Sequence, residues 1–402
     1  MAEREGTTAQ PAAHAPSIGA GRLSALDGIR ALAIIMVIAF HTTSISRFPL
    51  DRLGVLAMPV VHGWMGVDLF FGMSGFLITR LWLEEEEAAP SETAGSRARR
   101  FFARRSLRIL PLYYITLGGF LLLARFVHLR SLMPFARSVA ADPWALGSYL
   151  LFFVNYVSFG RDGAFALRWS LCVEEHFYLL WPCVLLLART RRHRVAVAAL
   201  AIVAVLAARS FAIVFGDHRQ GWATFMMVRY SSHLRIDAIL MGCLAALVYD
   251  TLVSAPRARR VFLAASIAVV GLFVAVGEMT VMRAPTPIGG GVGSSLIAAS
   301  AALLAAEVTA APRSWLARLL AVRPLPMIGS HSYAMYLVHP LAIDIAVGIV
   351  LHPVSAPTIG HWALTVALTV ALALLAAVVL HWTVEQPFRR LRARFRLVRP
   401  AE

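Results

Sequence analysis

The sequence contains no lysine, so all 38 residues of the Lys/Arg class are arginine. Together with the abundant alanine, this absence indicates a GC-rich coding sequence and says nothing direct about function. Charged residues of every kind are scarce, at 15% of the 402 residues, against roughly 25% in ordinary soluble domains. This low charge content argues against a soluble globular protein.

Cysteine is also rare, and Cys172, Cys183 and Cys243 all lie in apolar segments. Because no Cys/His spacing typical of zinc ligands is present, we expect neither a disulfide framework nor a metal site. Cys172 is a weak candidate for a covalent nucleophile, since no base serves it at helical spacing. The alternating pattern of a membrane barrel is absent as well.

Hydrophobic residues make up 59% of the chain, in recurring runs of about 20 residues, the length that spans a bilayer core as a helix. We therefore predict an all-α polytopic protein, integral to the cell membrane. The ten predicted spans are 27–46, 61–83, 107–127, 171–189, 195–215, 231–250, 260–281, 289–309, 327–350 and 361–383. The net charge of +16 comes from arginine clusters between spans, which indicates orienting loops rather than nucleic-acid binding.

One further apolar segment, 144–159, is short, and the arginine clusters decide how it is interpreted. If it crossed the membrane, the cluster at 189–194 would lie outside, whereas ten spans keep every cluster on the cytoplasmic side. We therefore predict an interfacial or re-entrant segment in an outer loop, with both termini cytoplasmic. The predicted organisation is a disordered tail at 1–24, a membrane core at 25–388 and a basic tail at 389–402.

The first span carries two ionisable residues, Arg30 and His41. Eleven residues at about 100° each return to nearly the same helix face, and they separate the two side chains by about 16 Å along the axis. Arg30 alone could be an interfacial anchor, and His41 alone could be bonded to a neighbouring helix. Because intramembrane ionisable residues are costly and usually line a cavity, their shared face favours a functional pair.

Carboxylates recur in the second and fourth spans. Asp68 has no evident role except to pair with a cation or to orient a histidine, as a catalytic histidine requires; a structural Asp–Arg pair is about as plausible. Glu174 and Glu175 are hard to explain by packing. Glu174 shares a helix face with Ser170 and Tyr178 at a spacing of four residues, while Glu175 faces elsewhere.

Three arginines, Arg104, Arg105 and Arg108, lie at the cytoplasmic start of the third span. Composition alone favours their interpretation as positive-inside charge. The functional alternative is a phosphate-binding patch at a cytoplasmic entrance, because forked guanidinium groups suit phosphates.

Two later spans also carry polar side chains. Arg235 lies near the outer end of the sixth span, and Ser332, Tyr336 and His339 share one face of the ninth at i, i+4 and i+7. These residues are either hydrogen-bonding contacts between helices or part of a binding site.

Taken together, these motifs resemble acyltransferase family 3, the integral membrane O-acyltransferases, over residues 23–392. No single motif is specific, but their order along the chain is. The matching pieces are "LDGIRALAIIMVIAFH", "GWMGVDLFFGMSGFLI", "RRSLRILPLYY", "WSLCVEEHFYLLWP", "RIDAILMG", "GSHSYAMYLVHP" and "VEQPFRRL".

The resemblance implies a core of ten membrane helices that moves an acyl group from a cytoplasmic donor, usually acyl-CoA, to a hydroxyl. Acceptors in the family include envelope glycans, lipopolysaccharide sugars and macrolides. The Arg–x10–His motif of the family falls on Arg30 and His41, with His41 as the general base. His176 stands where glutamine is common. Some members carry a further hydrolase-like domain, which we do not expect here.

We therefore expect a membrane O-acyltransferase with acyl-CoA as cosubstrate, no bound cofactor and a hydroxyl-bearing acceptor. The expected catalytic residues are His41, Asp68 and Glu174. The expected donor- and substrate-binding residues are Arg30, Arg104, Arg105, Arg108, Ser170, Glu175, Arg235, Tyr336 and His339. The rival interpretations are a transporter of a glycan or lipid-linked intermediate and a structural membrane subunit.

Overall fold

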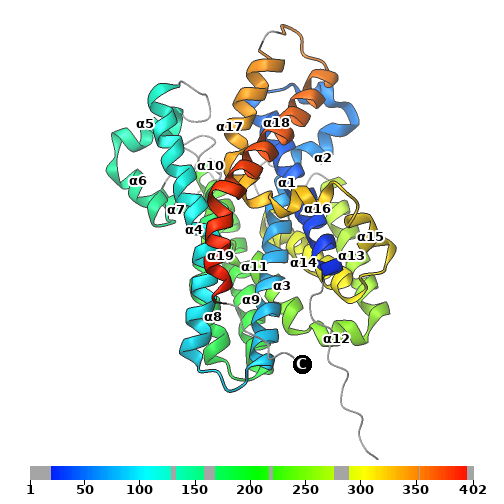
Figure 1. Cartoon of the computed structure of the whole chain (residues 1–402). Coiled ribbons are helices and arrows are strands. Elements are labelled where there is room, and N and C mark those ends of the chain that lie inside the picture. Colours follow the sequence, from blue (N-terminus) through cyan, green and yellow to red (C-terminus); the bar gives the residue numbers. More distant parts are fainter. Residues whose placement is uncertain are drawn as a thin grey trace, which may run out of the picture.

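The computed structural model describes residues 20–127, 133–157, 168–216, 221–275, 289–352 and 354–395, and these ranges contain helices and no strand. Figure 1 shows a bundle whose long helices run roughly in one direction, with shorter helices at its ends. The all-α prediction is therefore confirmed. Helix α1 begins at Ala20, inside the segment predicted as a tail, and residues 1–19 lie outside the described ranges.

Within the described ranges, nine helices are long and apolar enough to cross a membrane, which identifies a multi-pass integral membrane protein. They are α1 (Ala20–Ser46), α3 (Met65–Ala88), α4 (Ala94–Phe126), α8 (Trp169–Leu187), α9 (Arg191–Phe215), α13 (Pro256–Ala275), α14 (Gly289–Ala310), α17 (Ser332–Val350) and α18 (Ile359–Leu380). The shorter helices are η1 (Leu50–Leu56), α2 (Ala57–Val61), α5 (Met133–Ala141), α6 (Pro143–Leu150), α7 (Val154–Val157), α10 (Gly221–Tyr230), η4 (Ser232–Leu234), α11 (Ile236–Leu247), α12 (Tyr249–Ser254), α15 (Trp315–Leu320), α16 (Leu325–Ser330), the π-helix η5 (His381–Glu385) and α19 (Gln386–Ala393).

The sixth predicted span, 231–250, differs from the prediction. It is divided among η4, α11 and the start of α12, and α11 has only 12 residues. Twelve residues rise about 18 Å, which is shorter than a hydrocarbon core of about 30 Å. The polar residues Ser231 to Arg235 interrupt the helix before α11. The prediction of ten full-length spans is therefore corrected, for the described residues, to nine together with this short buried helix.

The segment 144–159 is divided into α6, with 8 residues, and α7, with 4 residues. Neither helix is long enough to cross a bilayer, which agrees with the prediction that this segment does not span. Residues 158 and 159 lie outside the described ranges.

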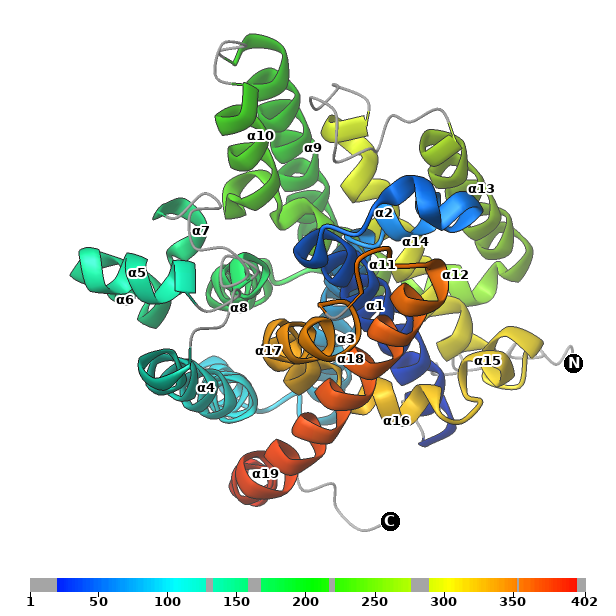
Figure 2. The ribbon, with the colours of Figure 1, turned by 90° about the horizontal axis from the view of Figure 1, so that it is seen from above.

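Helix α3 lies near the centre of the bundle, beside α1 and α11 (Figure 2), and it also packs against α14. Glycines permit this close approach. A Cβ atom at Gly75 would lie 1.9 Å from the carbonyl oxygen of Ile239, and one at Gly242 would lie 2.0 Å from that of Gly72. Since small residues let membrane helices approach closely, these two glycines set the distance between α3 and α11.

A buried arginine joins three helices next to this contact. Arg209 of α9 is fully buried and donates to both carboxylate oxygens of Asp237 in α11, at 2.8 and 2.9 Å. It also donates to Ser295 in α14 and to the carbonyl oxygens of Leu234 and Gly291. A buried charge is tolerated when it is paired and fully hydrogen-bonded in this way.

Arginines from two of the clusters between spans, at 97–108 and 189–194, meet acidic side chains at one end of the bundle. Glu86 of α3 pairs with Arg97 of α4 at 2.9 Å and with Arg194 of α9 at 2.6 Å. Asp250 of α12 pairs with Arg191 at 2.6 Å. Because arginine-rich short loops stay in the cytoplasm, we expect this end to be cytoplasmic.

We expect Gly75→Ala to lower the free energy of unfolding of the solubilised protein by roughly 1–3 kcal/mol or more, the usual cost of overpacking. The added methyl group would meet a backbone oxygen, which cannot move aside. Gly118→Ala in α4 is the matched control, because nothing lies within 4 Å of its Cβ position. Equal thermal unfolding of the two variants would contradict the packing argument.

The orientation can be tested by cysteine labelling. After the three native cysteines are replaced, a cysteine at Arg192, which is exposed at the predicted cytoplasmic end, should escape a membrane-impermeant thiol reagent in intact cells. A cysteine at Ser355, exposed in the α17–α18 connection at the opposite end, should react. Labelling at Arg192 in intact cells would show that the predicted orientation is wrong.

Candidate active site

A cavity of about 570 Å³ lies between α1, α3, α4, α8 and α17. It follows α3 from Val67 to Leu81, which are 14 residues apart and therefore separated by about 21 Å of helix rise. Most of its wall is apolar. Its polar lining residues are Arg30, Ser74, Arg105, Arg108, Ser170, Glu174, Tyr178, Ser332, Tyr333 and Tyr336. An elongated apolar cavity with a few placed polar groups is typical of a ligand site.

Four arginines were expected from the sequence to bind the donor. Three of them, Arg30, Arg105 and Arg108, line the cavity. Arg30 donates to Asp27 at 2.7 Å, and the guanidinium carbon of Arg105 lies 5.4 Å from the centre of the Tyr178 ring. Arg108 also lines the cavity. These side chains give one region of the cavity a positive charge.

The structure places Arg104 elsewhere, although it is adjacent to Arg105 in sequence. Its guanidinium donates to Glu85 at 2.8 Å and to the carbonyl oxygen of Phe395 at 2.9 Å, and it does not line the cavity. Successive residues of a helix point in different directions, so only Arg105 and Arg108 of this cluster reach the cavity wall.

Glu174 lies in the cavity wall with two hydroxyl donors. Tyr178 donates to one carboxylate oxygen at 3.2 Å and Ser74 to the other at 3.3 Å. The sequence placed Tyr178 on this face, but the contact of Ser74 across to α8 was missed, because a serine in a membrane helix usually bonds its own backbone. Glu175 does not line the cavity, and its Oε1 has no hydrogen-bond partner among the described residues.

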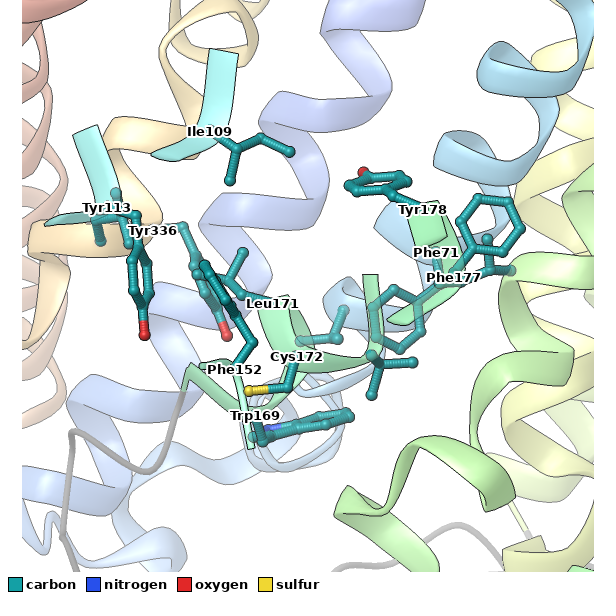
Figure 3. Close-up of a cluster of buried hydrophobic side chains, with 14 of the residues drawn as sticks. Phe71, Ile109, Tyr113, Phe152, Trp169, Leu171, Cys172, Phe177, Tyr178 and Tyr336 are labelled. Carbon is teal, nitrogen blue, oxygen red and sulfur yellow. The ribbon is translucent and has the colours of Figure 1, made fainter. Parts of the chain in front are cut away.

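Ser170 and Tyr336 meet within the cavity wall, with their hydroxyl oxygens 2.7 Å apart. They come from α8 and α17, 166 residues apart in sequence. Figure 3 shows Tyr336 beside Leu171 and the apolar cluster that supports this part of the wall. Cys172 is fully buried in this cluster and does not line the cavity, which leaves it poorly placed for the nucleophilic role considered from the sequence.

His41 and His339 face each other just beyond Tyr336. His41 Nδ1 lies 3.0 Å from His339 Nε2, and the two rings are nearly parallel, at 17°, with their centres 5.1 Å apart. The ring of His339 is 5.5 Å from that of Tyr336. Neither histidine lines the cavity, so this pair lies one side-chain layer away from it. Both histidines could be identified as candidates from the sequence, but their contact could not, because they lie 298 residues apart.

Asp68 pairs with Arg235, not with His41. Both side chains are buried, and the guanidinium carbon of Arg235 lies 5.5 Å from the centre of the Trp169 ring. Of the two roles that the sequence left open for Asp68, the structure therefore shows the pairing with a cation. Arg229, whose guanidinium stacks 4.2 Å from the centre of the Trp64 ring, was not predicted, because α10 carries no span-like signal.

Comparison with known proteins identifies relatives that are named as O-acetyltransferases. The chain is 26% identical over 357 residues to the peptidoglycan O-acetyltransferase OatA of Listeria monocytogenes, covering 87% of this chain and 53% of the relative. It is 27% identical over 373 residues to the putative peptidoglycan O-acetyltransferase YrhL of Bacillus subtilis, covering 90% and 54%. It is 26% identical over 330 residues to the O-acetyltransferase OatA of Staphylococcus aureus, covering 79% and 50%.

The chain thus spans about half the length of these curated relatives. No solved structure matches it. The family described as "Acyltransferase domain" matches residues 23–381, which includes every helix that forms the cavity and both histidines. This match confirms the resemblance drawn from the motifs: the chain belongs to acyltransferase family 3.

Proposed function

We propose that this protein transfers an acetyl group from acetyl-CoA, bound from the cytoplasmic side, to a hydroxyl of an envelope glycan such as peptidoglycan. The observation that carries the proposal is the arrangement of the cavity. Cations lie at one part of its wall, paired hydroxyls lie at another, and a histidine pair lies directly beyond. The relatives from Listeria monocytogenes and Bacillus subtilis are named as peptidoglycan O-acetyltransferases, which supports acetyl as the acyl group and peptidoglycan as the acceptor.

The donor fits the cavity by charge and by shape. Arg30, Arg105 and Arg108 suit the phosphate groups of a CoA thioester, because guanidinium groups bind phosphate in a forked geometry. The apolar wall along α3 suits the long arm that joins these phosphates to the thioester. The thioester carbonyl would then lie near Ser170 and Tyr336.

The hydroxyl groups and histidines beyond the arginines suit the chemical step. Attack of the acceptor oxygen forms a C–O bond and breaks the C–S bond of the thioester. The negative charge that develops on the carbonyl oxygen is stabilised by hydrogen-bond donors, for which the hydroxyls of Ser170 and Tyr336 are candidates. His41 takes the proton of the acceptor hydroxyl and passes it to the departing thiolate.

The experiment that tests this function uses the purified full-length protein in nanodiscs with acetyl-CoA and soluble peptidoglycan fragments. We expect free CoA to appear together with glycan fragments that are heavier by one acetyl group, measured by mass spectrometry. Macrolides and other sugars are tested in parallel. Acetylation of a macrolide alone would overturn the proposed acceptor, and no acyl transfer with any acceptor would overturn the function.

We expect His41→Ala to lower kcat by roughly 10²–10⁴-fold, the usual contribution of a general base, without changing the KM for acetyl-CoA. The side chain lies outside the cavity, so its loss should leave donor binding intact. His352→Ala, which removes an exposed histidine at the end of α17, is the control. A well-folded His41→Ala protein with near-wild-type turnover would rule out this base.

Arg105→Ala and Arg104→Ala form a matched pair for the donor site. We expect Arg105→Ala to raise the KM for acetyl-CoA on the order of tenfold or more, because a charge-assisted hydrogen bond contributes about 1.5–3 kcal/mol. Arg104→Ala should change it little, since Arg104 is held by Glu85. Steady-state kinetics with acetyl-CoA varied separate the two, and an equal or reversed ranking would contradict this donor site.

A further inference from the structure

The contact between His41 and His339 has a consequence for the protonation of both rings. The inference drawn from it rests on the proposed role of His41 as the general base. We infer that His339 is a positioning residue: by accepting a hydrogen bond at Nε2, it fixes the tautomer of His41 in which Nε2 carries the lone pair. The relay consists of a backbone carbonyl and two imidazoles, with no carboxylate in contact with either ring among the described residues.

The first step concerns Nδ1 of His339. This nitrogen lies 2.7 Å from the carbonyl oxygen of Tyr336, one turn earlier in α17. A carbonyl oxygen can only accept a hydrogen bond, so Nδ1 of His339 must carry a proton. In a neutral imidazole the other nitrogen is then an acceptor, which means that Nε2 of His339 has a lone pair.

The second step concerns His41. Its Nδ1 lies 3.0 Å from the lone pair of His339, so Nδ1 of His41 is the donor and carries the proton. Nε2 of His41 is therefore unprotonated in the neutral ring. No described residue hydrogen-bonds to this nitrogen, and the His41 side chain is partly exposed. The free lone pair is the one that a general base requires.

The opposite arrangement is unfavourable. If His41 accepted at Nδ1, both nitrogens of His339 would carry protons, and a charged imidazolium would sit at a position that is 0% exposed. Burying an unpaired charge is costly.

In this arrangement His339 has the role that the aspartate has in a Ser–His–Asp triad. There, the carboxylate holds the histidine in the required tautomer and stabilises the imidazolium that forms. Here, the lone pair of His339 does both, because it accepts from the neutral ring and from its protonated form, the latter as a charge-assisted bond. Asp68 is not available for this role, since it pairs with Arg235.

The test replaces His339 in the full-length protein and measures acetyl transfer from acetyl-CoA to peptidoglycan fragments. His339→Leu removes the acceptor, and we expect kcat to fall roughly 10²–10⁴-fold with the KM for acetyl-CoA unchanged. In His339→Gln the amide oxygen reaches the position of Nε2, and a large share of kcat should return. In His339→Asn the shorter amide does not reach His41, so kcat should stay low.

Two comparisons keep this inference apart from the proposed function and from simple misfolding. His331→Leu is the control, because His331 also contacts a backbone carbonyl, that of Met327, but does not touch His41. If His41→Ala is inactive while His339→Leu keeps wild-type kcat, the positioning role is wrong and the proposed function stands. If His339→Leu does not fold, equal kcat in the Gln and Asn variants overturns the role.

Discussion

The contact between α3 and α11 is the constraint on which the rest of the structure depends. Gly75 and Gly242 bring the two backbones together, so the short helix α11 can be enclosed by longer ones. This enclosure makes a 12-residue helix acceptable in a membrane protein, because its polar ends face protein and not lipid. It also fixes α3 as the central helix, with Ser74 and the apolar side chains of its other face directed into the cavity.

The arginines fall into two groups, those that form ion pairs at one end of the bundle and those that line the cavity. Those near the connections, such as Arg97, Arg191 and Arg194, pair with acidic side chains at one end of the bundle. Arg105 and Arg108 instead line the cavity together with Arg30, where Glu174 is the one lining carboxylate among the described residues. Positive charge that acidic partners leave uncompensated attracts an anion. Neighbouring residues of one sequence cluster therefore differ, because Arg104 pairs with Glu85 while Arg105 lines the cavity.

Much of the fold could be predicted from the sequence, because apolar runs and arginine clusters report membrane spans directly. The sixth span could not be predicted, since its composition is apolar while its polar start at Ser231–Arg235 breaks the helix. Helical spacing correctly grouped Glu174 with Tyr178 and Ser170 on one face. It could not show that Arg104 points away from the cavity or that His41 meets His339, because these outcomes depend on how separate helices pack. Periodicity shows which residues share a face of one helix, but not how helices pack together. The site is formed by side chains from five helices.

The relation between the cavity and the histidine pair explains why a membrane helix would keep Arg30 and His41 on one face. Arg30 lies in the cavity wall, and His41 lies beyond Tyr336, in contact with His339. The axial separation of about 16 Å thus places the two residues on different sides of Tyr336. In the proposed reaction the donor would occupy the cavity, and the acceptor hydroxyl would have to reach both the thioester carbonyl beside Tyr336 and Nε2 of His41. Under the proposed function, the single helix α1 therefore carries both a donor-binding residue and the general base.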